Sequence, residues 1–452
     1  MSLFQEFPIA SEIEWKDQIL KDLKGLPFES LFSTTPGGIE RKPFYVSQNL
    51  NYAKSFLHKD WDILEYLPTS TQNVNKVLLE ALNAGASGFL VDLTLQSDVS
   101  KILDKVQSNY INSNFRLIEI EENIVYALSN YFSGYPKDTV WNASISMDFI
   151  SRLIESGSWF KNEEFDKNLF LKSVSIFSKY KGIRPVVIEG SIYQNSGVNV
   201  FTELGMILSH ANFYLEFLLE NGCDKKEIAN YFQFNFSVGT DFFLEIAKLR
   251  AFQKLWKFLL SAYQIEGEAY ISTCPTLLDK TSLDPYNNLL RITTQSMAAV
   301  IGGSRSHISI PFDFCYSDPN DFSRRISRNQ QLIFKEEAYL NKIMDIGYGS
   351  YYLEELTTEI ESKSYEFFQG IESKGGILVA TSDGSVSQAI LSQSKELIKQ
   401  YESGKKILIG VNKFQNPSDK KSQAISRKIY PVTELKGRGL NYINLESCLI
   451  SD

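Results

Sequence analysis

The sequence predicts an α/β protein folded as a (β/α)₈ barrel, the TIM-barrel arrangement, with an N-terminal helical arm and a short αβ C-terminal extension. From about residue 72, short apolar or β-branched runs alternate with helical patterns, at spacings of roughly 25 to 50 residues. Eight such runs occur, which is the strand count of a closed barrel: Gly88–Leu93, Phe115–Ile120, Val140–Ser146, Arg184–Glu189, Phe232–Val238, Glu268–Thr273, Ser306–Pro311 and Lys342–Ile346. A doubly wound sheet also has buried parallel strands, so the spacing of the apolar runs favours the barrel without excluding that alternative.

Residues 1–71 are expected to form an arm and linker that dock on another surface. Ser11 and Glu14 have capping-box spacing, and Gly25 is placed to end the helix. The apolar side chains on one helical face are Trp15, Ile19 and Leu23. They are too few to form a core, so they pack on the chain's own barrel or on another subunit. The stretch TTPGGIERKPFY that follows is typical of a loop.

Residues 72–375 are assigned to the barrel, and two of its helices are clear. DFFLEIAKLRAFQKLWKFLL has an apolar stripe, with Lys248 and Lys254 outside it. In DPYNNLLRITTQSMAAVIGG, Asp284 is the expected N-cap, Pro285 the first helical residue and Gly302 the stop. A further amphipathic helix follows Leu353. Residues 376–452 are predicted to be a strand–helix–strand extension, from the runs ILVATSDGS and KILIGVNKF.

Composition excludes several classes of function. The formal net charge of −8 argues against nucleic acid or an anionic membrane as a partner. No apolar run is long enough to span a bilayer, and the N-terminus does not resemble a signal peptide. The four cysteines form no CxxC pair, so we expect free thiols and a cytoplasmic location. Three histidines far apart in the sequence give no local metal site.

A search for general catalytic motifs finds no GxGxxG, GxxxxGK[ST], GxSxG or HExxH. Arg250 lies on the flank of a helix, where a salt bridge is the expected role. Arg324, Arg325 and Arg328 share one helix and are expected on a solvated face. His307, beside a predicted barrel strand, is more typical of a core histidine than of a catalytic one.

Several blocks together resemble the methylmalonyl-CoA mutases, a family of adenosylcobalamin-dependent isomerases. DPYNNLLRITTQSMAAVIGGSRSHISIPFD is similar to the family's D-P-x-N-N-x-x-R-T-T-x-E-A-M-A-A-x-x-G-G-T-Q-S-L-H-T-N-S-F-D. FSRRISRNQQLIFKEEAYLNKIMDIGYGSYYLEELT and TDFFLEIAKLRAFQKLW resemble two further family segments, as do WKDQILKDLKG and GGIERKPFY near the N-terminus. The resemblance covers roughly residues 1 to 375 and implies a barrel that holds acyl-CoA along its axis, followed by a cobalamin domain.

Two departures from the family pattern bear on function. The cobalamin-domain motif D-x-H-x-x-G does not occur around His58, His210 or His307, and little sequence follows Phe414, so we expect that domain to be absent. The family's catalytic tyrosine–histidine pair falls at Ser191 and Ile192 when its glutamine is aligned on Gln194. The glutamine of the family's G-G-T-Q-S-L-H-T reads Arg305.

The resemblance and its departures predict the small, non-catalytic subunit of a heterodimeric methylmalonyl-CoA mutase. It would bind no cofactor or metal itself, while a homologous large subunit would carry adenosylcobalamin. A vestigial substrate channel would contain Gln194, Arg250, Arg305 and His307, and the subunit interface would contain Trp15, Ile19 and Leu23. One alternative is the barrel chain of a split acyl-CoA mutase that receives cobalamin from a separate domain. Another is a non-enzymatic relative that binds only an acyl-CoA or a partner such as a cobalamin-loading GTPase.

Overall fold

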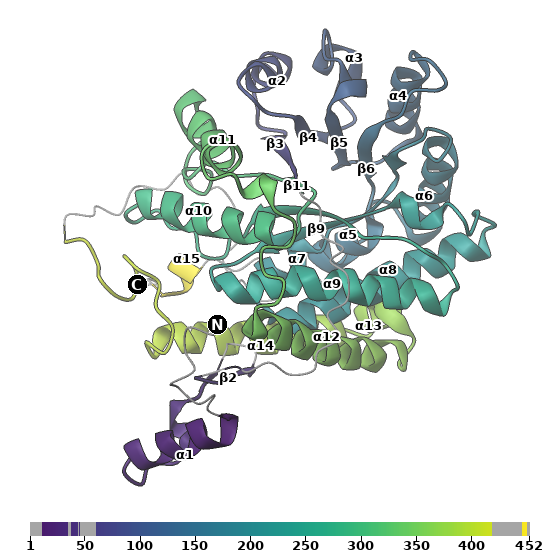
Figure 1. Ribbon diagram of the computed structural model, residues 1–452. Coiled ribbons are helices and arrows are strands. Elements are labelled where there is room, and N and C mark those ends of the chain that lie inside the picture. The colour runs from purple at the N-terminus through teal and green to yellow at the C-terminus, as the bar shows by residue number, and fades with distance from the viewer. Residues whose placement is uncertain (1–10, 35–37, 44, 46–59, 418–444, 450–452) are drawn as a thin grey trace, which may run out of the picture.

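The computed structural model describes residues 11–34, 38–43, 45, 60–417 and 445–449. Its centre is a parallel sheet in the order β7-β6-β5-β4-β3-β11-β10-β9-β8, surrounded by helices (Figure 1). The barrel strands are β3 (Asp62–Leu67), β4 (Gly88–Leu93), β5 (Asn112–Leu117), β6 (Asn142–Ser146), β7 (Ile183–Arg184), β8 (Val186–Ile188), β9 (Phe232–Val238), β10 (Tyr270–Pro275) and β11 (Ser306–His307). The predicted (β/α)₈ barrel is confirmed.

Helices follow the barrel strands and cover their outer face. Those of the arm and of the first half of the barrel are α1 (Glu12–Asp22), α2 (Val74–Asn83), α3 (Val99–Ile102), α4 (Glu122–Ser133), α5 (Phe149–Ser156), α6 (Glu163–Phe177), α7 (Ser191–Asn195) and α8 (Val200–Glu220). The remainder are α9 (Phe242–Ala262), α10 (Tyr286–Ile301), α11 (Asp321–Glu336), α12 (Tyr351–Glu372), α13 (Gly376–Ser382), α14 (Ser385–Glu402) and α15 (Leu445–Leu449). The long helices α8, α9 and α12 pack against one another below the barrel in Figure 1.

The barrel closes through one interrupted strand. Pro185 lies between β7 and β8, where a proline has no N–H to donate to a neighbouring strand. β7 pairs with β6, whereas β8 pairs with β9. The two short pieces therefore act as one barrel strand that passes from one neighbour to the next, so the nine pieces make eight strands.

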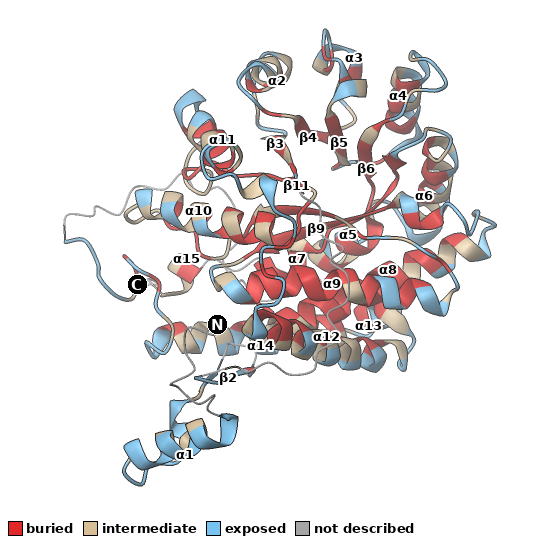
Figure 2. Ribbon diagram, viewed as in Figure 1, coloured by how far each residue is buried: buried red, intermediate tan, exposed pale blue. Residues whose placement is uncertain are grey.

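The two faces of the strands differ in polarity. Large apolar side chains point outward to the helices, as Phe89, Phe115 and Phe234 do, and they are completely buried there. Figure 2 shows this burial along the strands and the inner helices. The alternate residues, among them Asn114, Ser144 and Gln233, point inward and bond one another. Parallel strands usually have apolar residues on both faces, so this polar interior is unusual.

Lys248 of α9 is completely buried, although the helical pattern places it outside the apolar stripe. Its Nζ lies 2.6 Å from Glu245 and 3.1 Å from Glu203, and it donates to the carbonyl of Ser237 at 2.8 Å. Burial opposes the charged form of Lys248, but the two carboxylates outweigh it and raise the lysine's pKa. Burial also raises the pKa of Glu203. This cluster joins α8, α9 and the end of β9.

The expectation of a solvated arginine face on α11 is wrong for two of its three arginines. Arg324 and Arg328 are buried and pair with the two oxygens of Glu65 on β3, at 3.0 and 3.1 Å. Glu65 points outward from the barrel, so its charge has to be met by the helix that covers it. Only Arg325 of the three is exposed.

Two strand assignments need correction. β3 at Asp62–Leu67 is a barrel strand inside the segment 1–71 that was assigned to the arm and linker. Its run DILEYL has charged residues on both faces, which hides the strand pattern. Conversely, Lys342–Ile346 is not a strand, since Ile343 and Ile346 are exposed in a loop that the buried pair of Asp345 and Arg250 holds in place.

The C-terminal extension is helical in its described part, not a strand–helix–strand unit. ILVATS lies in α13, and KILIGVNKF forms turns with one isolated bridge between Ile409 and Lys413. Helix α10 begins at Tyr286 with Pro285 as its N-cap residue, and Gly302 ends it as expected. Asp284 does not cap the backbone, because its carboxylate accepts from the side chain of Asn287 at 2.8 Å.

The N-terminal arm projects from the barrel (Figure 1). Ser11 and Glu14 form the predicted capping box, and no residue of α1 is buried. Trp15 contacts the ring of Phe28 edge-on at 6.1 Å, so the stripe is partly covered by the arm itself. The stretch expected to be a loop takes part in a short antiparallel pair, β1 (Ser33–Thr34) with β2 (Glu40–Arg41), and Ile39 just before β2 is buried in the core.

Replacing Lys248 by Met should destabilise the protein by about 3–5 kcal/mol, because Glu203 and Glu245 would remain buried without a cation. The change is measured as the shift in urea unfolding. Lys254→Met on the same helix is the matched control, since its Nζ lies 3.7 Å from Glu361 in a partly exposed pair and should contribute less than about 1 kcal/mol. Equal shifts in the two variants would contradict the role given to the buried cluster.

Candidate functional site

A cavity of about 600 Å³ opens at the carboxyl ends of the barrel strands. In (β/α)₈ enzymes this end of the barrel holds the active site. Tyr66, Leu117, Ser146 and Cys274, from four different strands, line it together with residues of the loops that follow. The cavity is therefore the candidate functional site.

One wall of the cavity is a closed polar cluster. Arg116 donates from Nε to Asp92 Oδ1 at 2.8 Å and from Nη2 to Asp92 Oδ2 at 2.9 Å. The hydroxyl of Tyr66 donates to Asp92 Oδ2 at 2.9 Å and accepts from Arg116 Nη2 at 2.5 Å. Burial raises the pKa of Tyr66, so this phenol is not a base at neutral pH. The guanidinium is already neutralised by a bidentate carboxylate, which leaves little charge for an incoming anion.

Two further carboxylates, Glu189 and Asp148, also line the cavity. Glu189 accepts from Ser146 at 2.8 Å and from Asn235 at 3.0 Å. Asp148 accepts from His210 Nε2 and from the Tyr214 hydroxyl, both at 2.9 Å. Although burial opposes it, contact with His210 and other donors lowers the pKa of Asp148. These carboxylates are satisfied by the protein's own donors.

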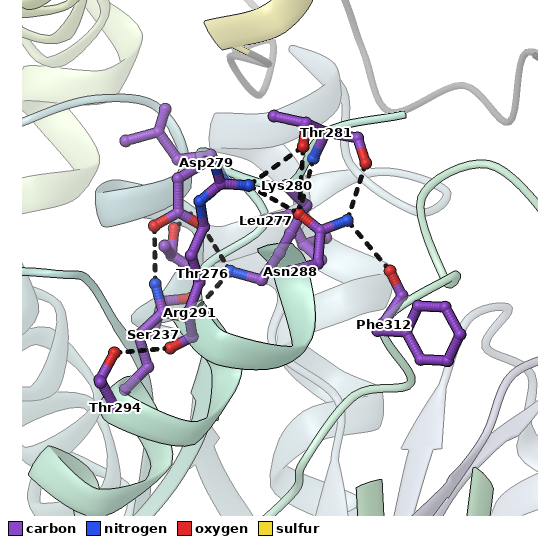
Figure 3. Close-up of polar contacts among 12 residues, drawn as sticks. Ser237, Thr276, Leu277, Asp279, Lys280, Thr281, Asn288, Arg291, Thr294 and Phe312 are labelled. Atoms are coloured by element: carbon purple, nitrogen blue, oxygen red, sulfur yellow. Dashed lines mark hydrogen bonds and ion pairs between the residues drawn. The ribbon is translucent and has the colours of Figure 1, made fainter. Parts of the chain in front are cut away.

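The loop after β10 is fixed at the rim of the cavity by side chains of α10 (Figure 3). Asn288 accepts from the N–H of Thr281 at 2.9 Å and donates to the carbonyls of Thr281 and Phe312 at 2.7 and 3.1 Å. Arg291 donates to Thr281 Oγ1 at 3.0 Å. Asn288 and Arg291 of the DPYNNLLR block therefore have a structural role, since they hold the loop after β10 in place.

Below the cavity, the barrel axis is occupied by side chains that hydrogen-bond from strand to strand. At the amino end, Arg184 lies 3.6 Å from the ring centre of Tyr270 and donates to Gln233 at 2.9 Å. Asn142 donates to Asp62 at 2.9 Å. Further bonds lead upward through Asn112, Asn114, Ser144 and Asn235 to Glu189. None of these residues at the amino end lines the cavity, so the cavity ends above them.

The residues proposed for a vestigial channel do not lie together. Ser191 and Ile192 line the cavity, but the side chain of Gln194 points away and donates to Glu245 at 2.6 Å. Arg305 lies at the opposite end of the barrel, before β11, and pairs with Glu268 at 2.7 Å. Arg250 is buried among the outer helices.

Arg250 forms the expected salt bridges, with Asp345 and with Glu354, the latter at 2.5 Å. His307 is completely buried and points outward from β11. Its Nδ1 lies 2.7 Å from Thr273 Oγ1 and its Nε2 lies 2.8 Å from Ser296 Oγ. The core-histidine interpretation thus fits the geometry.

The described residues do not fit a cobalt ligand. Among them, no group of three His, Cys, Asp or Glu side chains could hold a metal ion. His210 and His307 are fully buried, and each uses both ring nitrogens in contacts with the protein. His58 lies outside the described residues. Every described helix is too short or too polar to cross a bilayer.

The sequence search missed Arg116, Glu189 and Asp148, which give the cavity its polar character. A signal was present in the strands, where polar and apolar residues alternate in NSNFRL, NASIS and FQFNFSV. Alternation in a strand that must be buried on both faces indicates polar groups inside the barrel. The apolar runs alone could not reveal these inward-facing polar residues.

Comparison with known proteins gives consistent matches. A family model for methylmalonyl-CoA mutase matches residues 97–438. The methylmalonyl-CoA mutase small subunit of Porphyromonas gingivalis is 29% identical over 92% of this chain and 71% of its own length. Methylmalonyl-CoA mutase of Cereibacter sphaeroides is 26% identical over 89% of the chain, and the mitochondrial mutase of Homo sapiens is 26% identical over 91%. The chain spans 64% and 62% of these two relatives, less than two thirds of their length.

A chain of the methanol:cobalamin methyltransferase complex MtaBC from Methanosarcina barkeri aligns over 83% of this chain and 84% of its own, with a TM-score of 0.26 and 8% identity. Such a similarity is too low to support an inference.

His307 should make the protein less stable in acid. Burial lowers its pKa to about 3, against 6.5 for the free side chain. Between these values the unfolded chain takes up a proton that the folded chain excludes, so the free energy of unfolding falls by up to about 1.4 kcal/mol per pH unit below pH 6.5. His307→Gln should remove this component. Urea unfolding from pH 7.5 to 4.5 measures the free energy of unfolding of both proteins. The difference between these free energies should be constant above pH 7 and should change below it. A constant difference over the whole pH range would contradict the assignment.

Proposed function

The chain belongs to the methylmalonyl-CoA mutase family, and on this premise we propose that it is the small subunit of a two-chain mutase. In this role it supports a homologous large subunit, which interconverts methylmalonyl-CoA and succinyl-CoA. The chain itself binds no cofactor, and adenosylcobalamin resides in the large subunit. The match to a relative named as a small subunit, over 92% of this chain, supports the role.

The observation that carries the proposal is the occupied barrel axis. An acyl-CoA laid along the axis needs a continuous space, whereas here Arg184 stacks on Tyr270 and both belong to a hydrogen-bonded network. Opening that space would leave several buried polar groups without partners, at about 1–3 kcal/mol each. The network therefore resists opening by a ligand.

The mouth of the barrel gives independent support. Family members are cobalamin-dependent isomerases, and the cofactor supplies radical chemistry that the protein must shield from water. When the family motif is aligned on Gln194, Ser191 and Ile192 take the positions of the family's tyrosine and histidine, and isoleucine cannot donate a hydrogen bond to a carbonyl. Arg116, which faces the cavity, is held by Asp92 and is not free to bind a carboxylate.

The alternative of a split acyl-CoA mutase requires an open axis in this chain, so the packed axis counts against it. We also propose that the complex is cytoplasmic, because all four cysteines are free thiols.

Mixing experiments test the proposed role. The purified chain with adenosylcobalamin and methylmalonyl-CoA should show no turnover above a no-enzyme control, and calorimetric titration with methylmalonyl-CoA should show no binding. Mixed with a methylmalonyl-CoA mutase large subunit, it should give a one-to-one complex by light scattering, with mutase turnover. Turnover by the chain alone would revive the split-enzyme alternative, and failure to form the complex would refute the subunit role.

The arm is expected to contribute to this assembly, and Trp15→Ala with Leu23→Ala tests it. Because α1 projects from the barrel and buries no residue, the double variant should leave the barrel's thermal melting unchanged. It should weaken binding to the large subunit by about 10- to 100-fold, since the stripe is only partly covered by Phe28 and would lose apolar contact with the partner. Unchanged affinity would show that the arm takes no part in assembly, and unfolding of the barrel would show that Trp15 and Leu23 support the barrel itself.

A further inference from the structure

An unusual concentration of exposed apolar side chains lies in the loop between α11 and α12 and at the first residue of α12. Ile343 and Met344 are 64% and 56% exposed, and Ile346, Tyr348 and Tyr351 are also exposed. Phe243 of α9 is exposed nearby, with its ring 5.7 Å from that of Tyr352. We call the residues Ile343, Met344, Ile346, Tyr348, Tyr351 and Phe243 the 343–351 face.

The loop that carries this face is fixed before any partner arrives. Asp345, in its middle, has φ of 42° and forms the buried pair with Arg250, while Tyr339 and Gly349 also have positive φ. The N–H of Gly349 donates to Glu354, which Arg250 also contacts. The polar residue points inward and its apolar neighbours point to solvent, so their exposure is built into the loop. A preformed surface of this kind loses little conformational entropy on binding.

The size of the face suits a protein partner. Its six residues are each between 39% and 64% exposed, and together they expose on the order of 700 Å², which is comparable to the roughly 800 Å² that one partner contributes to a stable interface. The aromatic and methionine side chains are those enriched at such interfaces.

The face also adjoins the base of the arm. The Tyr352 hydroxyl accepts from Arg41 Nε at 3.0 Å, and its ring lies 5.0 Å from that of Tyr45. Arg41 further pairs with Asp241, and Lys42 with Glu355. The segment that leads to α1 thus leaves the barrel beside the 343–351 face, so one partner can contact both.

We propose that the 343–351 face is a docking surface for the homologous large mutase chain, continuous with the arm. The identity of this partner rests on the proposed function; the existence of a preformed apolar face does not. The large chain covers Ile343, Met344 and Ile346 while the arm extends along its surface.

Three single variants, Ile343→Asp, Met344→Asp and Ile346→Asp, test the proposal in the full chain. Each places a charge in the interface without touching the buried core, so thermal melting should be unchanged, and a variant that melts lower is set aside in favour of the others. Each should weaken binding to the large mutase subunit by about 100-fold, measured by biolayer interferometry. Tyr110→Asp is the matched control, since Tyr110 is 80% exposed before β5 and should bind as the unmodified chain does.

The outcomes separate the two proposals. If the unmodified chain binds the large subunit and the three variants bind equally well, the docking surface is wrong and the subunit role stands. If the unmodified chain binds no large subunit, both fail. If the chain instead forms a dimer with itself that the three variants disrupt, the face is an interface but the partner assigned to it is wrong.

Discussion

A polar side chain that points into the barrel can be buried only if a neighbouring strand supplies its hydrogen-bond partner, and most of this structure follows from that constraint. Ser144 bonds to Asn114, Arg184 to Gln233, and Asn235 to Glu189, each across the boundary between two neighbouring strands. A slip of one residue in any strand would turn these groups toward the apolar helices and leave them without partners. The network thereby fixes the register of the strands, and it fills the axis through which a ligand would otherwise pass.

Much of the barrel could be predicted because its outward faces are strongly apolar. β4 and β9 lie where the runs Gly88–Leu93 and Phe232–Val238 placed them. The strand predictions were wrong where a charged residue is buried. The strand β3 was missed because it contains Glu65, whose partners on α11 are distant in sequence. The segment Lys342–Ile346 was predicted to be a strand, but its apolar residues face solvent because Asp345 is held inward by Arg250. Ion pairs between elements remote in sequence, such as Lys248 with Glu203, cannot be predicted from the local sequence pattern.

Part of the site could be predicted from the family motif. Ser191 and Ile192 could be placed at the barrel mouth by comparison with a family motif, and both line the cavity. Arg305 and Gln194 could not be placed, because adjacency to a motif does not say which end of a barrel a side chain occupies. Arg116 and Asp92 come from different strands, and only the fold brings them within 2.8 Å.

The interrupted strand at Pro185 makes the barrel two arcs joined at narrow seams. β6 pairs with β7 through only two residue pairs, and on the far side the short strand β11 pairs through two with β3 and through two with β10. By contrast, β4 and β5 share six pairs, as do β9 and β10. The fewest backbone partners hold the ring together at these seams, so sub-global opening there needs less free energy than at the β4–β5 or β9–β10 boundary.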